Sequence, residues 1–418
     1  MQAWTRPFVP RVTVETDDAP SRLRVHDTAR EELVEVGPVD GTARMYVCGI
    51  TPYDATHLGH ANTYLTFDLM NRVWRDLGLA VNYTQNVTDV DEPLLERAEQ
   101  TGVRWQDLAL DQTDLFRSDM EALRVIPPDH YIGAVESVPS VLGLLESMLP
   151  SGAVYQVDDP EHPDWYFDVS TAPGFGSISH LDHDAQLKKF VEMGGDPDRE
   201  GKRNPLDCLV WRLHRNGEPH WESTALGEGR PGWHIECSAI ALGHLGPHFD
   251  VQGGGSDLAF PHHEMCAAQA RVASGEPLAD AFVHSGMVAL DGEKMSKSKG
   301  NLELVSRLRA NGAEPTAIRV ALLDHHYRSD WEWTDTQLEA SEQRLATWRQ
   351  AVSRAEGSAP VEALVKGLRT SLRDDLDAPA ALVVVDDWAR RTLAGEGADD
   401  PEQAVAAIDA LLGVSLTA

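Results

Sequence analysis

The chain has 418 residues, of which 42% are hydrophobic and 25% are charged, so it can build a core and is not a disordered polymer. Its 67 acidic residues against 36 Lys and Arg give a formal net charge of −31, which excludes a surface that binds nucleic acid over a broad area. Four cysteines are too few for a disulfide-stapled scaffold. Without a signal peptide or a run of about 18 apolar residues, we expect a cytoplasmic protein with no membrane partner.

The first recognisable unit lies near the N-terminus. Residues 1–44 are rich in Pro, Asp and Thr, and we expect an N-terminal extension there rather than part of a core. A short apolar run at 45–50 predicts a buried strand, and helical spacing of apolar residues follows it. The segment 80–87 is typical of a second strand. The region 45–126 therefore predicts a strand–helix–strand unit, which implies a parallel sheet.

The remaining regions differ in their periodicity. Region 127–230 is interrupted by Pro, Gly, Asp and His, which predicts a connective insertion between two halves of a split sheet. Region 231–332 again shows helix and strand patterns, and region 333–418 is helical throughout. The predicted fold is α/β, with a split parallel sheet, an insertion and a C-terminal α-helical bundle.

The first chemical motif is His57-Leu58-Gly59-His60, at the start of the predicted helix. The two imidazoles share a helix face near an N-terminus whose free N–H groups favour phosphate. Two ring N–H donors at such a place can stabilise charge that develops on a phosphate under attack. Taken alone, the pair also fits surface or metal-binding histidines, which are the commoner case.

The second motif is the loop GEKMSKSKGN at 292–301, which carries Lys294, Lys297 and Lys299. In a chain this acidic, a local cluster of lysines is conspicuous. A cationic loop of this kind can close over a triphosphate and hold the leaving pyrophosphate. Taken alone, a solvated lysine loop is the simpler explanation.

Together, H-x-G-H after a first strand and KMSKS after a late one resemble the signatures of the class I aminoacyl-tRNA synthetases. That resemblance implies a Rossmann-like catalytic domain that activates a carboxylate with ATP, usually with Mg²⁺ on the phosphates. The segments CGITPYDATHLGHANTY, YTQNVTDVDE, GWHIECSA and GGGSDLAFPHHE resemble the branch of this family that activates cysteine.

A metal site is implied by the same resemblance. Cys48, Cys237 and His262 match the residues that bind zinc in the cysteine-activating branch, although spacing alone would favour buried free cysteines and a core histidine. They would hold one Zn²⁺ per chain and leave a position open for the thiolate of substrate cysteine. Cysteinyl-tRNA synthetases have a glutamate ligand where this chain has Cys266, and we leave Cys266 out of the predicted ligand set.

The branch contains enzymes with different acceptors for cysteine. Region 331–418 holds 8 Lys and Arg against 16 Asp and Glu, a poor surface for tRNA. GITPYDATHLGHANTYLTFDL and EMGGDP (192–197) resemble the cysteine ligases of mycothiol biosynthesis more closely, with Met193 where those ligases usually have arginine. We expect ATP, L-cysteine and glucosaminyl-inositol as partners, no tRNA, and a monomer; cysteinyl-tRNA synthetase is the alternative.

The expected reaction joins cysteine to the aminosugar amine through a cysteinyl-adenylate, releasing pyrophosphate and then AMP. His57, His60, Lys294 and Lys297 are predicted to be catalytic, because they would stabilise charge on the ATP phosphates. By resemblance, Trp233 packs on substrate cysteine, Asp257 accepts from ribose, and the Val288 backbone meets adenine. Most of the other predicted adenylate-binding residues follow strands, where ligands lie in open α/β sheets. The full adenylate-binding set is Cys48, Gly49, Ile50, Thr51, Thr63, Asn86, Val87, Thr88, Trp233, Gly255, Ser256, Asp257 and Val288.

Overall fold

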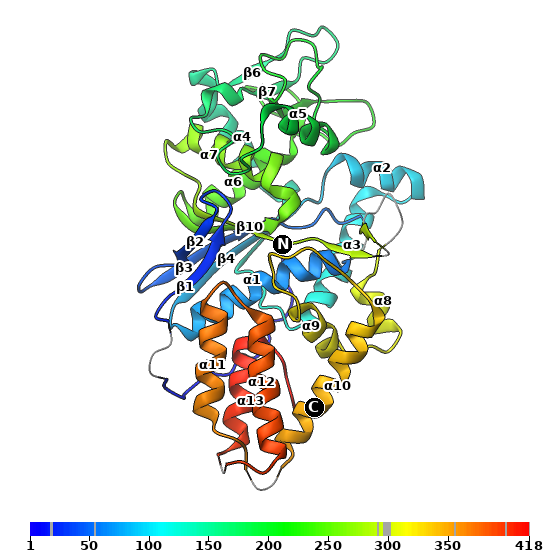
Figure 1. Cartoon of the computed structure of the whole chain (residues 1–418). Coiled ribbons are helices and arrows are strands. Elements are labelled where there is room, and N and C mark those ends of the chain that lie inside the picture. The colour runs from blue at the N-terminus through cyan, green and yellow to red at the C-terminus, as the bar shows by residue number, and fades with distance from the viewer. Residues whose placement is uncertain are drawn as a thin grey trace.

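The computed structural model describes residues 1–16, 20–53, 56–290, 292–295, 302–354, 357–397 and 399–417. A five-stranded parallel sheet lies at the centre, in the order β11-β10-β3-β4-β5 (Figure 1). Its strands are β3 (Thr42–Val47), β4 (Ala80–Val87), β5 (His130–Gly133), β10 (Phe249–Gly255) and β11 (Ala279–Ser285). Because β10 pairs with β3 across the whole intervening sequence, the sheet is split into two halves, as predicted.

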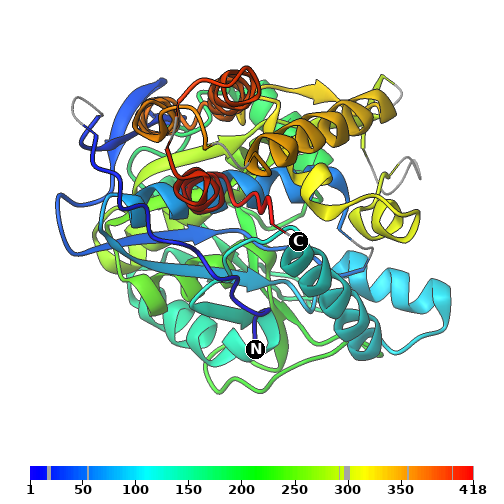
Figure 2. The ribbon, with the colours of Figure 1, turned by 90° about the horizontal axis from the view of Figure 1, so that it is seen from below.

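Helices cover both faces of this sheet (Figures 1 and 2). Helix α1 (Leu58–Asp76) packs between the sheet and the C-terminal helices, which explains why buried residues, polar ones among them, surround almost its whole circumference. The opposite face carries α4 (Ala134–Met148), α6 (Trp233–Leu245) and α7 (Glu264–Ser274), while α2 (Glu92–Thr101) and α3 (Trp105–Ala122) follow β4. None of the helices in the described ranges is both long and apolar enough to cross a bilayer.

The region between the two halves of the sheet forms a small antiparallel sheet of its own. Its strands pair in sequence order, and helix α5 (His183–Glu192) lies beside them. The short apolar runs interrupted by Pro and Gly explain why these strands are brief. The strands and short helical turns are β6 (Val154–Gln156), β7 (Trp165–Phe167), β8 (Cys208–Leu213), β9 (Gly229–Pro231), η1 (Leu149–Ser151) and η2 (Val169–Thr171).

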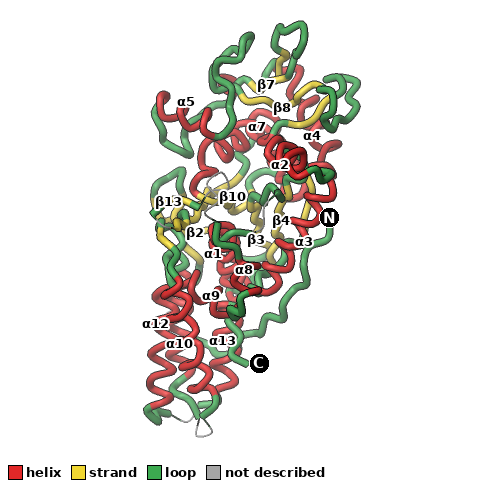
Figure 3. The backbone as a smooth tube through the Cα atoms, turned by 90° about the vertical axis from the view of Figure 1, so that its right-hand side faces the viewer, coloured by secondary structure: helices red, strands yellow, loops and turns green. Residues whose placement is uncertain are grey.

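The C-terminal part is helical and extends away from the sheet (Figure 3). In α11 the buried residues recur at helical spacing, so one face packs against α12 and α13. The predicted bundle is confirmed by α10 (Asp335–Val352), α11 (Val361–Arg373), α12 (Ala378–Leu393) and α13 (Pro401–Leu412). It is preceded by β12 (Val288–Leu290), β13 (Glu293–Lys294), α8 (Val305–Ala310), α9 (Pro315–Leu323) and β14 (Trp331–Glu332).

The N-terminal segment contributes to the core, so the expectation that it lies outside the core is wrong. Strands β1 (Leu23–Asp27) and β2 (Glu32–Val36) form an antiparallel hairpin, and the side chains of Leu23 and Val25 are completely buried. Trp4 is also buried, and its indole N–H donates to the carbonyl of Val125 at 2.8 Å. The alternation in LRVHD is the local signal for this strand.

A buried ionic cluster joins α1 to α9 and the bundle. The Asp68 carboxylate pairs with Arg72 at 2.8 Å and with Arg319, and all three side chains are fully buried. Although burial opposes ionisation, the two guanidinium groups hold the pKa of Asp68 below its ordinary value. Arg72 also donates to the carbonyl of Asp409 at 2.9 Å, and Arg319 to that of Leu412 at 2.6 Å. The cluster therefore fixes the bundle against the central sheet.

Candidate active site

The ends of β3 and β4 are held together by the side chain of Asn86. Its oxygen accepts hydrogen bonds from the Gly49 N–H at 2.7 Å and the Tyr46 hydroxyl at 3.0 Å, and its nitrogen donates to the Thr88 hydroxyl at 3.1 Å. A Cβ atom at position 49 would lie 1.7 Å from the Asn86 carbonyl oxygen, so only glycine fits there. The backbone that follows β3 is therefore fixed at this edge of the sheet.

A cavity of about 970 Å³ lies at this edge, between the strand ends, α1, α2 and the insertion. The predicted residues that line it are Cys48, Gly49, Ile50, Thr51, His57, His60, Thr63, Trp233, Gly255 and Asp257. Within the described part of the chain, the lining does not include Asn86, Val87, Thr88, Ser256, Val288, Cys237 or His262. Asn86 instead supports Gly49 from inside the sheet.

The two motif histidines stand together at one wall of the cavity. His57 is the N-cap of α1, where its Nδ1 accepts a hydrogen bond from the His60 N–H at 3.4 Å. The two rings stack with centroids 3.7 Å apart, and a Cβ at Gly59 would lie 2.9 Å from the His57 ring. Further along α1, the Thr63 hydroxyl lies 2.7 Å from that of Ser285 at the end of β11. The wall thus combines two imidazoles with a helix N-terminus.

The lysine loop begins beside the same cavity. Lys294 belongs to β13, whose backbone pairs with Ala289 in β12. Met295 follows it, is buried, and lines the cavity. Lys297 lies outside the described residues.

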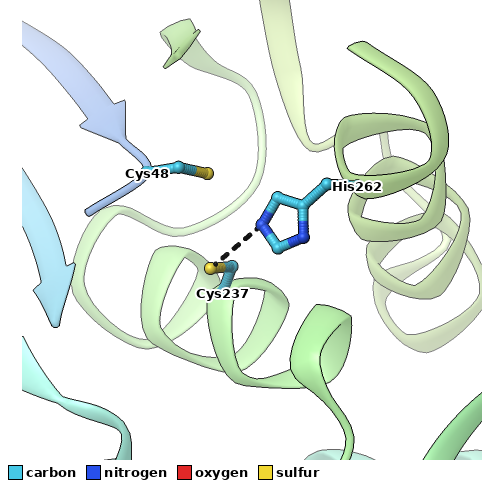
Figure 4. Close-up of side chains that lie close together, drawn as sticks. All are labelled: Cys48, Cys237 and His262. Carbon is cyan, nitrogen blue, oxygen red and sulfur yellow. Dashed lines mark hydrogen bonds between the residues drawn. The ribbon is translucent and has the colours of Figure 1, made fainter. Parts of the chain in front are cut away.

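Three buried side chains from separate segments converge next to the cavity (Figure 4). Cys48 follows β3, Cys237 lies in α6, and His262 lies in the turn η4 (Ala259–His263). Their ligand atoms all lie within 4.8 Å of one another, and the Nε2 of His262 is 3.3 Å from the Sγ of Cys237. This group could hold a metal ion.

The surroundings of the group fit a metal ligand set. Nδ1 of His262 lies 3.0 Å from Nδ1 of His234, whose pKa is lowered well below its ordinary value by burial and by His262. The Nδ1 of a neutral His234 can accept a hydrogen bond from the Nδ1–H of His262, which leaves the Nε2 lone pair of His262 directed toward the sulfurs. Hydrogen bonds from Cys266 and Cys48 lower the pKa of the Cys237 thiol, whereas burial raises that of Cys48. The direction of the shift at Cys237 suits a thiol that binds a metal as the thiolate.

Cys266 is not among the three converging residues. Its thiol donates to the carbonyl of His234 at 3.3 Å. The ring centroid of Trp233 lies 4.4 Å from that of His262. The sequence prediction that leaves Cys266 out of the ligand set is consistent with this arrangement but stays a prediction.

The sequence analysis missed two further buried histidines, His263 and His284, which form a chain of contacts from the sulfur of Cys48. The Cys48 sulfur lies 3.2 Å from Nε2 of His263, whose Nδ1 is 2.8 Å from Nε2 of His284. His284 in turn lies 2.7 Å from the Thr28 hydroxyl in the N-terminal segment. Burial lowers the pKa of His263, and it lowers that of His284 to about 4, so both rings are neutral near pH 7. The only signal in the sequence was the doubled histidine of HHE.

The comparisons first define the class of protein. The family model of the class I (C) tRNA synthetase catalytic domain matches residues 36–343. Methionyl-tRNA synthetase of Mycobacterium tuberculosis, in complex with methionyl-adenylate, has a similar fold: the TM-score is 0.62 at 17% identity, over 90% of this chain and 88% of that one. LeuRS of Agrobacterium radiobacter K84 in its ternary complex gives a TM-score of 0.61 at 12% identity, over 89% and 83%. The predicted α/β fold of class I synthetase type is confirmed.

Relatives of similar sequence and length then identify the group within this family. Proteins named L-cysteine:1D-myo-inositol 2-amino-2-deoxy-alpha-D-glucopyranoside ligase are 58% identical in Kribbella flavida and in Streptomyces avermitilis, over 100% of both chains in each case. The relative of that name in Thermomonospora curvata is 57% identical over the same share. The chain belongs to the class I (C) tRNA synthetase family and, within it, to this group of cysteine ligases.

Proposed function

We propose that the chain joins L-cysteine to the amine of glucosaminyl-inositol, using ATP and forming the amide needed for mycothiol. The observation that carries this proposal is the convergence of Cys48, Cys237 and His262 beside the cavity lined by His57 and His60. A site for a thiol thus lies next to a site for phosphate. The ligase name of full-length relatives at 58% identity supports the aminosugar, rather than tRNA, as the acceptor.

We infer that the metal is Zn²⁺, because two thiols and one imidazole are ligands that this ion prefers. Bound there, it would supply a soft partner for the thiolate of substrate cysteine, which the hydroxyl of serine cannot match. His234 and His263 would orient the ligands through the contacts described above. Mg²⁺ would accompany the phosphates of ATP.

In the first half-reaction the cysteine carboxylate attacks the α-phosphorus of ATP, and pyrophosphate leaves. His57, His60 and the N-terminus of α1 would stabilise the charge that develops on the α-phosphate. The cations of Lys294 and Lys297 would neutralise the leaving pyrophosphate. Asp257 would accept hydrogen bonds from the ribose, and Gly255 lets the nucleotide approach the end of β10.

In the second half-reaction the neutral amine of the aminosugar attacks the carbonyl carbon of the cysteinyl-adenylate. A C–N bond forms, the C–O bond to phosphate breaks, and AMP leaves with the electron pair while the nitrogen loses a proton. The mixed anhydride is already activated, so no side chain has to act as a covalent nucleophile. The chain's contribution to this step is to hold the two reactants together in one cavity.

The test is ATP–pyrophosphate exchange that depends on cysteine, with serine as the control. AMP release is then measured with added glucosaminyl-inositol and, separately, with added tRNA. We expect exchange with cysteine only and AMP release driven by the aminosugar. Exchange without a response to the aminosugar would refute the acceptor and leave cysteine activation intact; AMP release driven by tRNA would favour a cysteinyl-tRNA synthetase.

A further inference from the structure

The cavity at the strand ends has a second wall that the activation step described above does not use. This wall comes from the start of α2 and from the segment that ends α5, both of which line the cavity; the two helices are labelled in Figure 1. Asp91 and Glu92 line the cavity on the α2 side, and Phe190 and the turn at 192–196 line it on the α5 side. Cys48 and His57 line the same cavity, so a molecule on this wall shares a space with the adenylate site.

The turn at 192–196 is held by hydrogen bonds and close packing within the insertion. Gly194 has a φ of 88°, and the Gly195 N–H donates to the carbonyl of Phe190 at 2.8 Å. A Cβ at position 195 would lie 2.4 Å from the Phe190 ring, so bare backbone packs on this ring. The Asp196 carboxylate accepts from the Tyr166 hydroxyl at 2.5 Å and pairs with Lys202 at 3.1 Å. Its charge is therefore already satisfied inside the insertion.

The charged groups on the α2 side are also paired, with one exception. Glu92 pairs with Arg230 at 2.5 Å, and Arg230 pairs with Glu218 at 3.2 Å. Arg212 pairs with the same Glu218 at 3.1 Å. Asp91 caps α2 by accepting from the Glu92 N–H at 2.8 Å, but it forms no ion pair with any residue in the described ranges.

The cation that acts on Asp91 is Arg230, which is already paired with Glu92 and Glu218. Burial and the hydrogen bond with Glu92 raise its pKa well above the ordinary value. A bound ammonium group would supply a further positive charge. Across the cavity, the exposed carboxylate of Glu192 has no cationic partner among the described residues. This wall therefore suits a protonated amine on a neutral polyol and repels a phosphodiester.

We propose that this second wall is the acceptor subsite and that Asp91 binds the amine and neighbouring hydroxyls of the aminosugar. The inference rests on the proposed function and deepens it by placing the acceptor. The ring of Phe190 and the bare backbone of Gly195 offer a flat surface for the sugar ring, and Glu192 faces its outer side. Fixed in this way, the ammonium group would give up one proton to solvent, and the neutral amine would then lie beside the carbonyl of the adenylate.

The experiment compares the parent chain with Asp91→Asn. Asparagine caps helices as well as aspartate does, so the start of α2 is kept. We expect the KM for glucosaminyl-inositol to rise about tenfold or more, because a charge-assisted hydrogen bond is lost, while cysteine-dependent exchange continues at the parent rate. The matched control is Asp400→Asn, which changes the N-cap of α13 far from the cavity and should leave both reactions unchanged.

Each outcome decides between explanations. An unchanged KM for the aminosugar in Asp91→Asn would overturn the subsite and leave the proposed function standing. A raised KM for cysteine in the exchange assay would place Asp91 on the amino acid and overturn the proposal as well. If the parent itself shows no exchange or no response to the aminosugar, the proposed function fails. Should Asp91→Asn not fold, Glu192→Gln replaces an exposed residue of the same wall, and an unchanged KM there would count against the subsite.

Discussion

Two buried polar clusters flank the central sheet, and they differ in how completely their groups are paired. On the α1 side, Asp68 is enclosed by two guanidinium groups, which also donate to backbone carbonyls. On the α6 side, Cys48, Cys237 and His262 direct their donor atoms toward one point at the edge of a cavity. The first cluster is closed and holds the fold together. The second lies beside the cavity, and its donor atoms are close enough to one another to hold a metal ion.

Breaking the closed cluster should have the largest effect. In Asp68→Asn two buried guanidinium groups lose their shared carboxylate, so we expect the free energy of unfolding to fall by about 3–5 kcal/mol. Urea denaturation followed by circular dichroism measures this. The control is Asp107→Asn, which removes an exposed ion pair with Arg104 and should leave the free energy of unfolding almost unchanged. Equal losses in the two variants would show that the closed cluster is not a structural anchor.

Breaking the open cluster should affect chemistry more than stability. We expect Cys48→Ala to lose bound zinc and the preference for cysteine over serine. Exchange should fall by more than about a hundredfold, because changes outside the ligand set alone cost 10–100-fold. Metal analysis after dialysis and the exchange assay measure both effects. Cys208→Ala is the control, since Cys208 is a buried thiol that lines the cavity outside the converging group. Full metal occupancy in Cys48→Ala would refute the ligand set.

A change in the histidine pair at the start of α1 separates metal binding from catalysis. His60→Ala removes one of two stacked imidazoles and should lower exchange by about a hundredfold, the usual cost of one donor to a developing charge. Zinc content should equal that of the parent, because His60 is not part of the converging group. Loss of zinc together with activity would show that the two sites are one structural unit.

The Glu92–Arg230 pair lies between the two extremes, because it is buried on one side and exposed on the other. Although burial opposes it, Arg230 lowers the pKa of Glu92 to about 2. The stability that this pair adds to the folded state is therefore fully present above the unfolded pKa of about 4.3 and is lost as the pH falls toward 2. Glu92→Gln should remove this acid-dependent part, about 1 kcal/mol or less. The free energy of unfolding at pH 6 and at pH 3 measures this contribution, with the exposed Glu99→Gln as control. The same loss of stability between pH 6 and pH 3 in Glu92→Gln and in the parent would contradict the prediction.

Local patterns were sufficient for the regular elements of the fold. The unit from β3 to β4, helix α6 and the C-terminal bundle all carry the periodicity of the structure they form. The place of the β1–β2 hairpin in the core was not predicted, because its strands are short and its buried side chains find their partners far along the chain. Their burial depends on packing against the sheet, which no local window contains.

The candidate site divides in the same way. His57 and His60 are neighbours on one helix turn, so spacing alone brought them together. Cys48, Cys237 and His262 come from three segments, and only the family resemblance could group them. Asp91 stood in a motif that was already noticed, but its significance depends on which neighbours carry charge, and those come from the insertion.

The insertion is tied to the turn that carries His262 through one buried side chain. Glu264 stands two positions after His262. Its carboxylate accepts hydrogen bonds from the backbone N–H groups of Gly176, Ile178 and Ser179 at 2.7–3.1 Å. The exchange of these amide protons with deuterated solvent is consequently a measurable reporter. Slow exchange would show that the hydrogen bonds to Glu264, and with them the turn of His262, are intact. Amide exchange at 176–179 would therefore report on the structure around His262 without a substrate or a probe in the cavity.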